Sequence, residues 1–197
     1  MRSSSRPGLA VAGALLTATL LPVLLVGCSG PDLAEPFSSA EARATAGVGS
    51  VPAPADAQEV TVERVVDGDT LLVSGEAGAV LPGSGEHRVR LLLVDTPEVD
   101  GPNASQECLG PESSTFTADL LPEGSTVLLA ADEERVDSYD RLLAYAWTPE
   151  GVFVNEALTA NGFAYAVAIA PNDQHLGAVL AGEQRAREAR LGVWGSC

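Results

Sequence analysis

Three carboxylates and two arginines in this sequence are of the types that could hydrolyse a phosphodiester bond. Asp69 directly follows an Asp-Gly pair. One short segment contains Arg90, Asp95 and Glu98, and Arg141 comes later in the chain. Carboxylate oxygens are the ligands that hard cations such as Ca²⁺ prefer. A further carboxylate can take a proton from water, and a guanidinium group can donate two parallel hydrogen bonds to a phosphate. Together the five residues predict metal-assisted phosphodiester hydrolysis.

Each of these residues also has an ordinary structural role open to it. The Asp-Gly-Asp run around Asp69 is typical of hairpin turns. Carboxylates such as Asp95 and Glu98 often cap backbone N–H groups where a helix or turn begins. Arg90 and Arg141, if they lie on strands, could protect a sheet edge or form ion pairs. The catalytic interpretation therefore depends on the combination and order of the five residues.

Three predicted strands carry most of these side chains. Residues 60–66 and 70–73 are aliphatic and β-branched and flank an Asp-Gly pair, which predicts a hairpin. Residues 87–94 predict a third strand, in which Arg88 and Arg90 share one face because side chains alternate along a strand. The proline that follows closely cannot donate to a sheet and ends this strand.

The rest of residues 59–197 predicts further short elements, and their length suits one domain with its own core. These elements are a helix over 110–121, strands over 125–130 and 141–147, a short helix over 153–160, and a final helix capped by Asn172 that continues to about Arg190. Five short antiparallel strands with one helix after the third and two near the C-terminus predict an α+β fold. We expect a five-stranded OB-like β-barrel with three helices.

The N-terminal segment predicts export. Residues 1–27 combine a basic start with a long apolar run that ends in Leu-Val-Gly before Cys28, and this resembles the signal peptide and lipobox of bacterial lipoproteins. That resemblance implies cleavage before Cys28 and attachment of a lipid to its thiol. The alternative is an uncleaved transmembrane anchor. Either way, we expect the domain to lie outside the cytoplasm, held to the cell membrane by a lipidated, disordered tether over residues 28–58.

The charge of the chain argues against a non-specific binder of nucleic acid. The formal net charge is −16, and residues 59–197 alone contain 23 acidic residues and 8 arginines, with no lysine anywhere in the sequence. Such a protein repels polyanions at long range. A bound divalent cation and a local group of arginines can still reverse the potential at a single site.

Two cysteines remain once Cys28 is assigned to the lipid. Cys108 and Cys197 are expected to form a disulfide in an oxidising compartment, although two free thiols are the alternative. The bridge would join the last residue to the middle of the domain. Closing a loop of about 90 residues contributes roughly 4–5 kcal/mol in the chain-entropy account.

Six segments, in this order and spacing, resemble the staphylococcal nuclease (thermonuclease) family across residues 60–197. They are Val65-Val-Asp-Gly-Asp-Thr70, Val89-Arg-Leu-Leu-Leu-Val-Asp-Thr-Pro-Glu98, Gly110-Pro-Glu-Ser-Ser-Thr-Phe116, Asp137-Ser-Tyr-Asp-Arg-Leu-Leu-Ala-Tyr145, Val154-Asn-Glu-Ala-Leu158 and Gln174-His-Leu176. The resemblance implies a calcium-dependent nuclease that cleaves DNA and RNA with little sequence preference and leaves 3′-phosphates.

The resemblance also implies a role for each matched residue. Asp69, Asp95 and the backbone carbonyl of Thr96 would bind Ca²⁺, and Glu98 would be the general base. The remaining family roles are transition-state stabilisation by Arg90 and Arg141 and a hydrogen bond from Tyr139 to a substrate phosphate.

Several positions depart from the family pattern. Ser138 stands where relatives often have lysine, and Asp140 replaces a glycine. Val167 and Ile169 stand where relatives have tyrosines that stack on bases, a contact worth about 1–3 kcal/mol per base. We therefore expect weaker substrate binding than in basic relatives.

Three classes of function remain to be weighed. The favoured one is an extracytoplasmic, monomeric, calcium-dependent nuclease that acts on nucleic acid from a membrane anchor. The second is a non-catalytic OB-fold lipoprotein that binds nucleic acid or another ligand. The third is a structural lipoprotein that responds to calcium.

Overall fold

The structure is a computed structural model that describes residues 51–99 and 107–197. The predicted signal peptide, Cys28 and most of the predicted tether lie outside these residues. No helix within the described ranges is long and apolar enough to cross a membrane.

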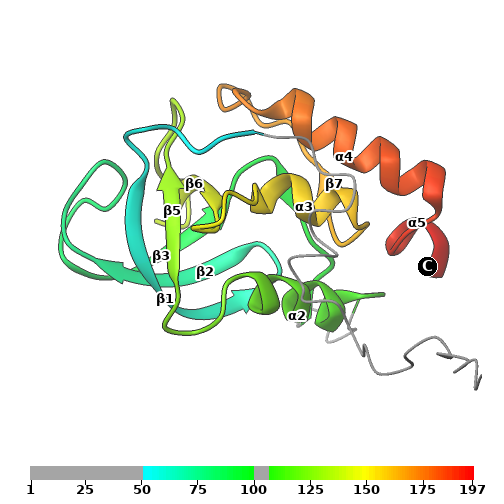
Figure 1. The fold of residues 1–197 in the computed structure, drawn as a ribbon, viewed down its shortest axis with the longest axis horizontal. Coiled ribbons are helices and arrows are strands. Elements are labelled where there is room, and N and C mark those ends of the chain that lie inside the picture. The colour runs from blue at the N-terminus through cyan, green and yellow to red at the C-terminus, as the bar shows by residue number, and fades with distance from the viewer. Residues whose placement is uncertain (1–50, 100–106) are drawn as a thin grey trace, which may run out of the picture. The chain divides into compact units, whose positions relative to one another are not determined.

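Five strands close into a barrel in the order β1-β2-β3-β6-β5 (Figure 1). Their bounds are β1 Gln58–Asp67, β2 Thr70–Gly75, β3 Gly85–Leu91, β5 Thr126–Ala130 and β6 Leu142–Trp147. Alternate side chains of these strands fill the barrel, among them the fully buried Val62, Leu71, Val73, Val89 and Leu129. The predicted OB-like α+β barrel is confirmed.

The predicted hairpin forms between β1 and β2. Asp67 pairs with Thr70, so Gly68 and Asp69 make the turn. A Cβ atom built on Gly68 would lie 2.7 Å from the Thr96 side chain. Only glycine lets the Thr96 segment approach the turn this closely.

One strand pair differs from the prediction of an antiparallel barrel. β3 and β6 run parallel, with Val89 opposite Leu142 and Leu91 opposite Ala144. Fifty residues separate the two strands, and this stretch includes α2 (Gly110–Leu120) and β5. Their direction is therefore set by how the barrel closes and not by a local turn, so sequence patterns do not reveal it.

The chain turns sharply where the predicted third strand was expected to continue. β3 ends at Leu91, Leu93 takes a positive φ of 64°, and the chain continues as β4 (Val94–Asp95). β4 pairs with β7 (Tyr165–Ala166) in a separate two-stranded sheet. The buried Asn155 holds the turn, because its Nδ2 donates to the Leu92 carbonyl at 2.7 Å and its Oδ1 accepts the Ala146 N–H at 3.0 Å.

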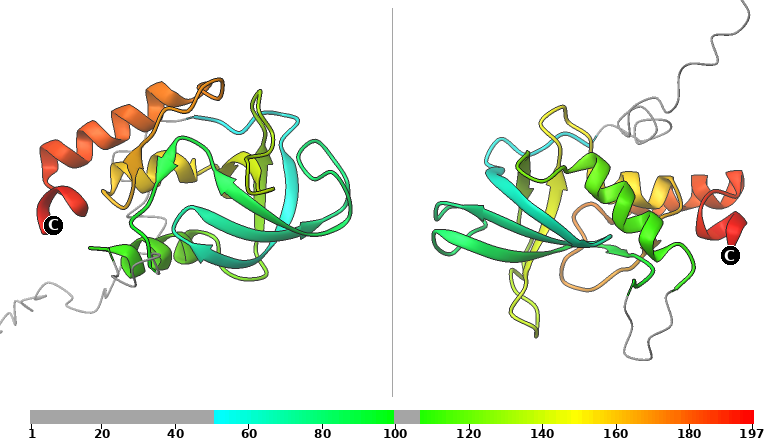
Figure 2. Two further views of the ribbon diagram at one scale, coloured as in Figure 1. Left: turned by 180° about the vertical axis from the view of Figure 1, so that it is seen from behind. Right: turned by 90° about the horizontal axis from the view of Figure 1, so that it is seen from below.

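The helices gather on one side of the barrel (Figures 1 and 2). The three predicted ones are present as α2 (Gly110–Leu120), α3 (Val154–Ala160) and α4 (Leu176–Ala189), and the four-residue α5 (Val193–Ser196) follows. Asn172 is not the N-cap of α4, since that position belongs to His175. The Asn172 amide instead bonds both the N–H and the carbonyl of Glu134, at 2.8 and 2.9 Å.

The ordered domain begins earlier than predicted. Residues 51–58 were assigned to the tether, yet Val51 and Ala53 pack against the core. The Val51 carbonyl accepts a hydrogen bond from the Trp147 indole at 2.8 Å. The predicted boundary therefore lies at least eight residues too late, because a short apolar segment becomes ordered through contacts made far along the chain.

A disulfide joins Cys108 to Cys197, with Cα atoms 6.1 Å apart. This is the pairing expected from the sequence. It fastens the C-terminal residue to the segment immediately before α2.

Replacing both Cys108 and Cys197 with serine should lower the free energy of unfolding of residues 51–197 by about 2–5 kcal/mol, because the unfolded chain then loses a long covalent loop. Urea unfolding measures this. The reduced wild-type domain is the matched control and should unfold at the midpoint of the double variant. Equal midpoints for oxidised and reduced wild type would contradict the prediction.

Candidate active site

Asp69 is a buried carboxylate at the β1–β2 turn, 5% exposed. Its Oδ2 accepts the Thr96 N–H at 2.8 Å and the Thr96 hydroxyl at 3.1 Å, and its Oδ1 accepts the Thr70 hydroxyl at 3.2 Å. Burial raises the pKa of Asp69 to about 7 against the opposing charge of Arg90. The carboxylate thus anchors the Thr96 segment, and any additional cation nearby would further stabilise its ionised form.

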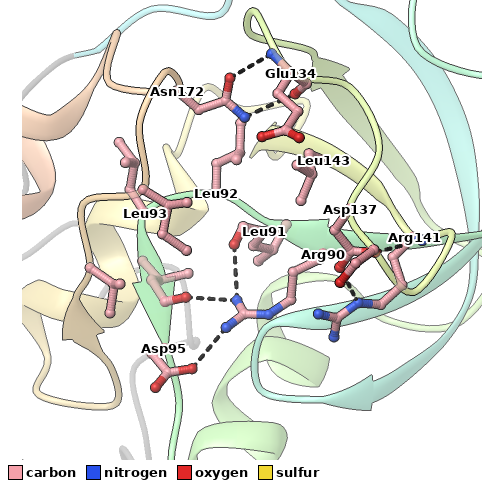
Figure 3. A pocket seen from close by; sticks show the side chains of 14 residues that line it. Arg90, Leu91, Leu92, Leu93, Asp95, Glu134, Asp137, Arg141, Leu143 and Asn172 are labelled. Atoms are coloured by element: carbon pink, nitrogen blue, oxygen red, sulfur yellow. Dashed lines mark hydrogen bonds and ion pairs between the residues drawn. The ribbon is translucent and has the colours of Figure 1, made fainter.

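Arg90 links the two acidic residues of the site. Its Nη1 lies 3.1 Å from Asp69 Oδ2, and its Nη2 lies 2.8 Å from Asp95 Oδ1. Nη1 also donates to the carbonyls of Leu91 and Val94 at 3.0 and 2.6 Å (Figure 3). Among the described residues no protein acceptor bonds the Nε–H or the second hydrogen of Nη2, so one edge of the fork is available to an anion.

The donor set around Asp69 and Asp95 fits a weakly held hard cation. Both carboxylates contact the same guanidinium, and the buried Asp69 would be stabilised in its ionised form by a second positive charge. Thr96, whose carbonyl is the third expected ligand, is fixed to Asp69 by two hydrogen bonds. The described residues hold no group of three or more His, Cys, Asp or Glu side chains able to hold a metal ion. Water and substrate would therefore supply much of the coordination of Ca²⁺.

Glu98 lies on the loop that leaves this acidic pair. Its backbone N–H donates to Glu107 Oε2 at 3.1 Å, and its carbonyl accepts the Glu107 N–H at 3.0 Å. Burial raises the pKa of Glu98, and the negative charges of Asp67, Asp95 and Glu107 raise it further, while Arg90 opposes them. A raised pKa makes this carboxylate a better proton acceptor once it is ionised.

Arg141 is held in position by Asp137. The Asp137 carboxylate accepts Arg141 Nε at 2.7 Å and the backbone N–H groups of Tyr139 and Arg141 at 2.9 Å each. Burial raises the pKa of Asp137, but these donors and the Arg141 charge outweigh it and hold the pKa below its usual range. The Arg141 guanidinium lies 5.4 Å from the centre of the exposed Tyr139 ring. Among residues 51–99 and 107–197 no acceptor bonds the four Nη hydrogens of Arg141, which can therefore bind a ligand.

Two neighbouring cavities share Arg141. The larger, about 490 Å³, has an apolar floor and brings Arg90, Asp95 and Arg141 together (Figure 3). The smaller, about 360 Å³, is lined by Arg88, Glu98, Tyr139 and Arg141. A pocket of this size suits a small organic ligand such as one nucleotide.

The structure gathers the candidate catalytic, metal-binding and substrate-binding residues from the sequence into this region, whereas Cys28, the predicted lipidation site, lies outside the described residues. Asp69, Thr96, Asp95 and Arg90 form one bonded cluster, whereas Glu98, Tyr139 and Arg141 join it through the two cavities.

Asp137 and Glu107 were not assigned roles from the sequence. The spacing of four residues between Asp137 and Arg141 was a usable signal. The sequence contains no such signal for Glu107, because its contact with Glu98 forms between irregular segments that have no periodicity.

The departures from the family pattern have structural counterparts. Asp140 has a φ of 60°, a left-handed conformation that explains a glycine at this position in relatives. Arg141 pairs with Asp137 and not with Asp140. Val167 and Ile169 line the larger cavity with aliphatic side chains.

Comparison with known proteins identifies the relatives of this chain. Residues 88–196 match the family model of staphylococcal nuclease homologues. A thermonuclease from Staphylococcus intermedius is 35% identical over 133 residues, 68% of this chain and 74% of the relative. The SPbeta prophage-derived endonuclease YokF and the endonuclease YncB, both from Bacillus subtilis (strain 168), are each 34% identical. These two matches cover 69% and 68% of this chain but only 44% and 61% of the two relatives.

Replacing Glu107 with glutamine should lower the pKa of Glu98, because one of the negative charges that raise it is removed. NMR titration of the Glu98 side-chain carboxyl carbon in calcium-free protein measures this. Glu112→Gln on α2 is the control for the same change in net charge. An unchanged or higher Glu98 pKa in the Glu107 variant would contradict the electrostatic account.

Proposed function

This chain belongs to the family of staphylococcal nuclease homologues, and we propose that it is a calcium-dependent nuclease that hydrolyses phosphodiester bonds of DNA and RNA with little sequence specificity. The observation that carries this proposal is the convergence of Glu98, Arg90 and Arg141 beside the Asp69–Asp95 pair. The thermonuclease and endonuclease names of its relatives support the same reaction class.

The side chains divide the chemistry between them. Glu98 accepts a proton from the water that attacks phosphorus, and its raised pKa suits this task. Arg90 and Arg141 donate to the phosphate oxygens on which negative charge accumulates during attack. Both guanidinium groups are held by carboxylates before substrate arrives, so little reorganisation is needed.

Calcium, held by Asp69, Asp95 and the Thr96 carbonyl, would supply positive charge next to the scissile phosphate. Two carboxylates give weak affinity, in the range of about 10⁻⁴–10⁻³ M found for extracellular calcium modules. Such affinity is adequate outside the cell, where we propose that a lipid on Cys28 anchors the protein to the membrane. We expect the enzyme to act as a monomer.

The alternative is a non-catalytic OB-fold lipoprotein that binds nucleic acid or another ligand. The exposed Tyr139 and the apolar floor of the larger cavity suit a binding role. That interpretation gives no role to Glu98, which lines the smaller cavity together with Arg141. A digestion assay separates the two, because a binding module retains DNA without cleaving it.

Replacing Glu98 with glutamine should reduce cleavage of denatured DNA by about 10²–10⁴-fold, because the proton acceptor is lost. The assay uses residues 51–197 with millimolar CaCl₂ and a parallel reaction in chelator, where wild-type cleavage should also stop. Glu150→Gln, an exposed residue in the turn after β6, is the control and should cleave like wild type. Chelator-resistant cleavage would rule out the calcium mechanism, and full activity of the Glu98 variant would rule out its role as base.

Replacing Asp140 with asparagine should lower KM for DNA about two- to fivefold, because a negative charge beside Arg141 is removed. Asparagine tolerates the positive φ of this position, so the loop should keep its conformation. Steady-state kinetics at low salt measure this, again with Glu150→Gln for the same change in charge. An equal decrease in KM for the control variant would show that net charge, not position, is responsible.

A further inference from the structure

Arg88 lies beside Arg141 because of the register of the parallel strands. Val89 pairs with Leu142 at the start of the β3–β6 ladder, so Arg88 and Arg141, one residue earlier, are neighbours on adjacent segments. Val89 and Leu142 are buried, and alternation along a strand therefore directs both arginines to the outside of the barrel. Arg88 also shares its face with Arg90, two residues further along β3.

Three arginines so close together repel one another in a folded protein. Like charges at neighbouring positions of a sheet are destabilising. Arg90 and Arg141 are each neutralised by aspartates, at 2.8 Å to Asp95 and 2.7 Å to Asp137. Within residues 51–99 and 107–197 no ion pair neutralises Arg88. An arginine in this position is suited to bind an anionic ligand.

The cavities indicate which anion. Arg90 lines only the larger cavity, Arg88 lines only the smaller one, and Arg141 lines both. With the scissile phosphate between Arg90 and Arg141, where Glu98 of the smaller cavity can act on it, a neighbouring phosphate of the same strand can lie beside Arg88 and Tyr139 of that cavity. Ser138 supplies no positive charge here, and the chain has no lysine. Arg88 is therefore the residue that can supply a positive charge to this phosphate.

We propose that Arg88 is a substrate-binding residue that holds the phosphate next to the scissile one. This inference rests on the proposed nuclease function. It adds that the enzyme favours substrates of at least two consecutive phosphodiesters. It also explains how a domain with a charge of −15 can retain a polyanion: three arginines form a short local track along β3 and the start of β6.

The test compares three short DNA substrates in the presence of calcium. A dinucleotide contains only the scissile phosphodiester, whereas trinucleotides extended on the 5′ or the 3′ side contain one more. Arg88→Gln should raise KM about three- to tenfold for one of the trinucleotides, leave kcat unchanged, and leave KM for the dinucleotide unchanged. Arg88→Lys should recover part of the loss, because it restores the charge but not the fork.

Arg64→Gln is the matched control. Arg64 lies in the same cross-strand row as Arg88, since both pair with Leu72, and it is exposed but lines neither cavity. This substitution removes the same charge and should leave KM and kcat for all three substrates unchanged. Equal effects of Arg88→Gln and Arg64→Gln, equal effects on dinucleotide and trinucleotide, or a lower kcat on the dinucleotide would each overturn the assignment.

Binding separates a failure of this proposal from a failure of the proposed function. The same oligonucleotides are titrated into a Glu98→Gln background by NMR, with and without Arg88→Gln. Loss of trinucleotide affinity alone supports the role of Arg88, even if the wild-type protein cleaves nothing. Unchanged trinucleotide affinity overturns it, even if the wild-type protein is an active nuclease.

Discussion

The buried Asp69 carboxylate is the interaction on which the site depends. A charge with 5% exposure is costly unless donors and cations surround it. Thr96 supplies two donors and Arg90 a positive charge. To satisfy Asp69, the hairpin turn, the end of β3 and the segment after β4 must all meet at one point. Gly68 permits the meeting because a side chain there would collide with Thr96.

The sequence predicted well what is determined locally. The hairpin, the shared strand face of Arg88 and Arg90, and the three helices follow from residue periodicity and turn residues over short windows. The parallel pairing of β3 with β6 and the turn at Leu93 did not, because they depend on barrel closure and on the buried Asn155. Asn172 shows the same limit. Asparagine is a common N-cap residue, but the Asn172 side-chain amide hydrogen-bonds the backbone of Glu134, which is distant in the sequence.

The candidate site residues were identified by their type and order in the sequence, whereas the residues that hold them in position were not. The motif around Arg141 predicts a phosphate-binding arginine, and the structure adds that Asp137 accepts two hydrogen bonds from Arg141 and one from the Tyr139 N–H. Asp140 replaces a glycine immediately before Arg141. Its positive φ marks it as a turn residue, and its carboxylate takes no part in the ion pair between Arg141 and Asp137. Partners that lie in irregular loops have no periodicity, so sequence patterns locate the reacting groups more readily than the groups that hold them.

The loop that carries Glu98 is held at both ends. On one side Thr96 is bonded to Asp69, and on the other Glu107 exchanges hydrogen bonds with Glu98 itself. The adjacent Cys108 is joined covalently to Cys197, and Gly110 packs against the Glu98 carbonyl so closely that a Cβ atom would lie 2.5 Å from it. A carboxylate with a raised pKa, surrounded by other acids, would otherwise move away from them. Fastening its backbone from both directions keeps Glu98 close to Asp95, where the proposed general base is needed.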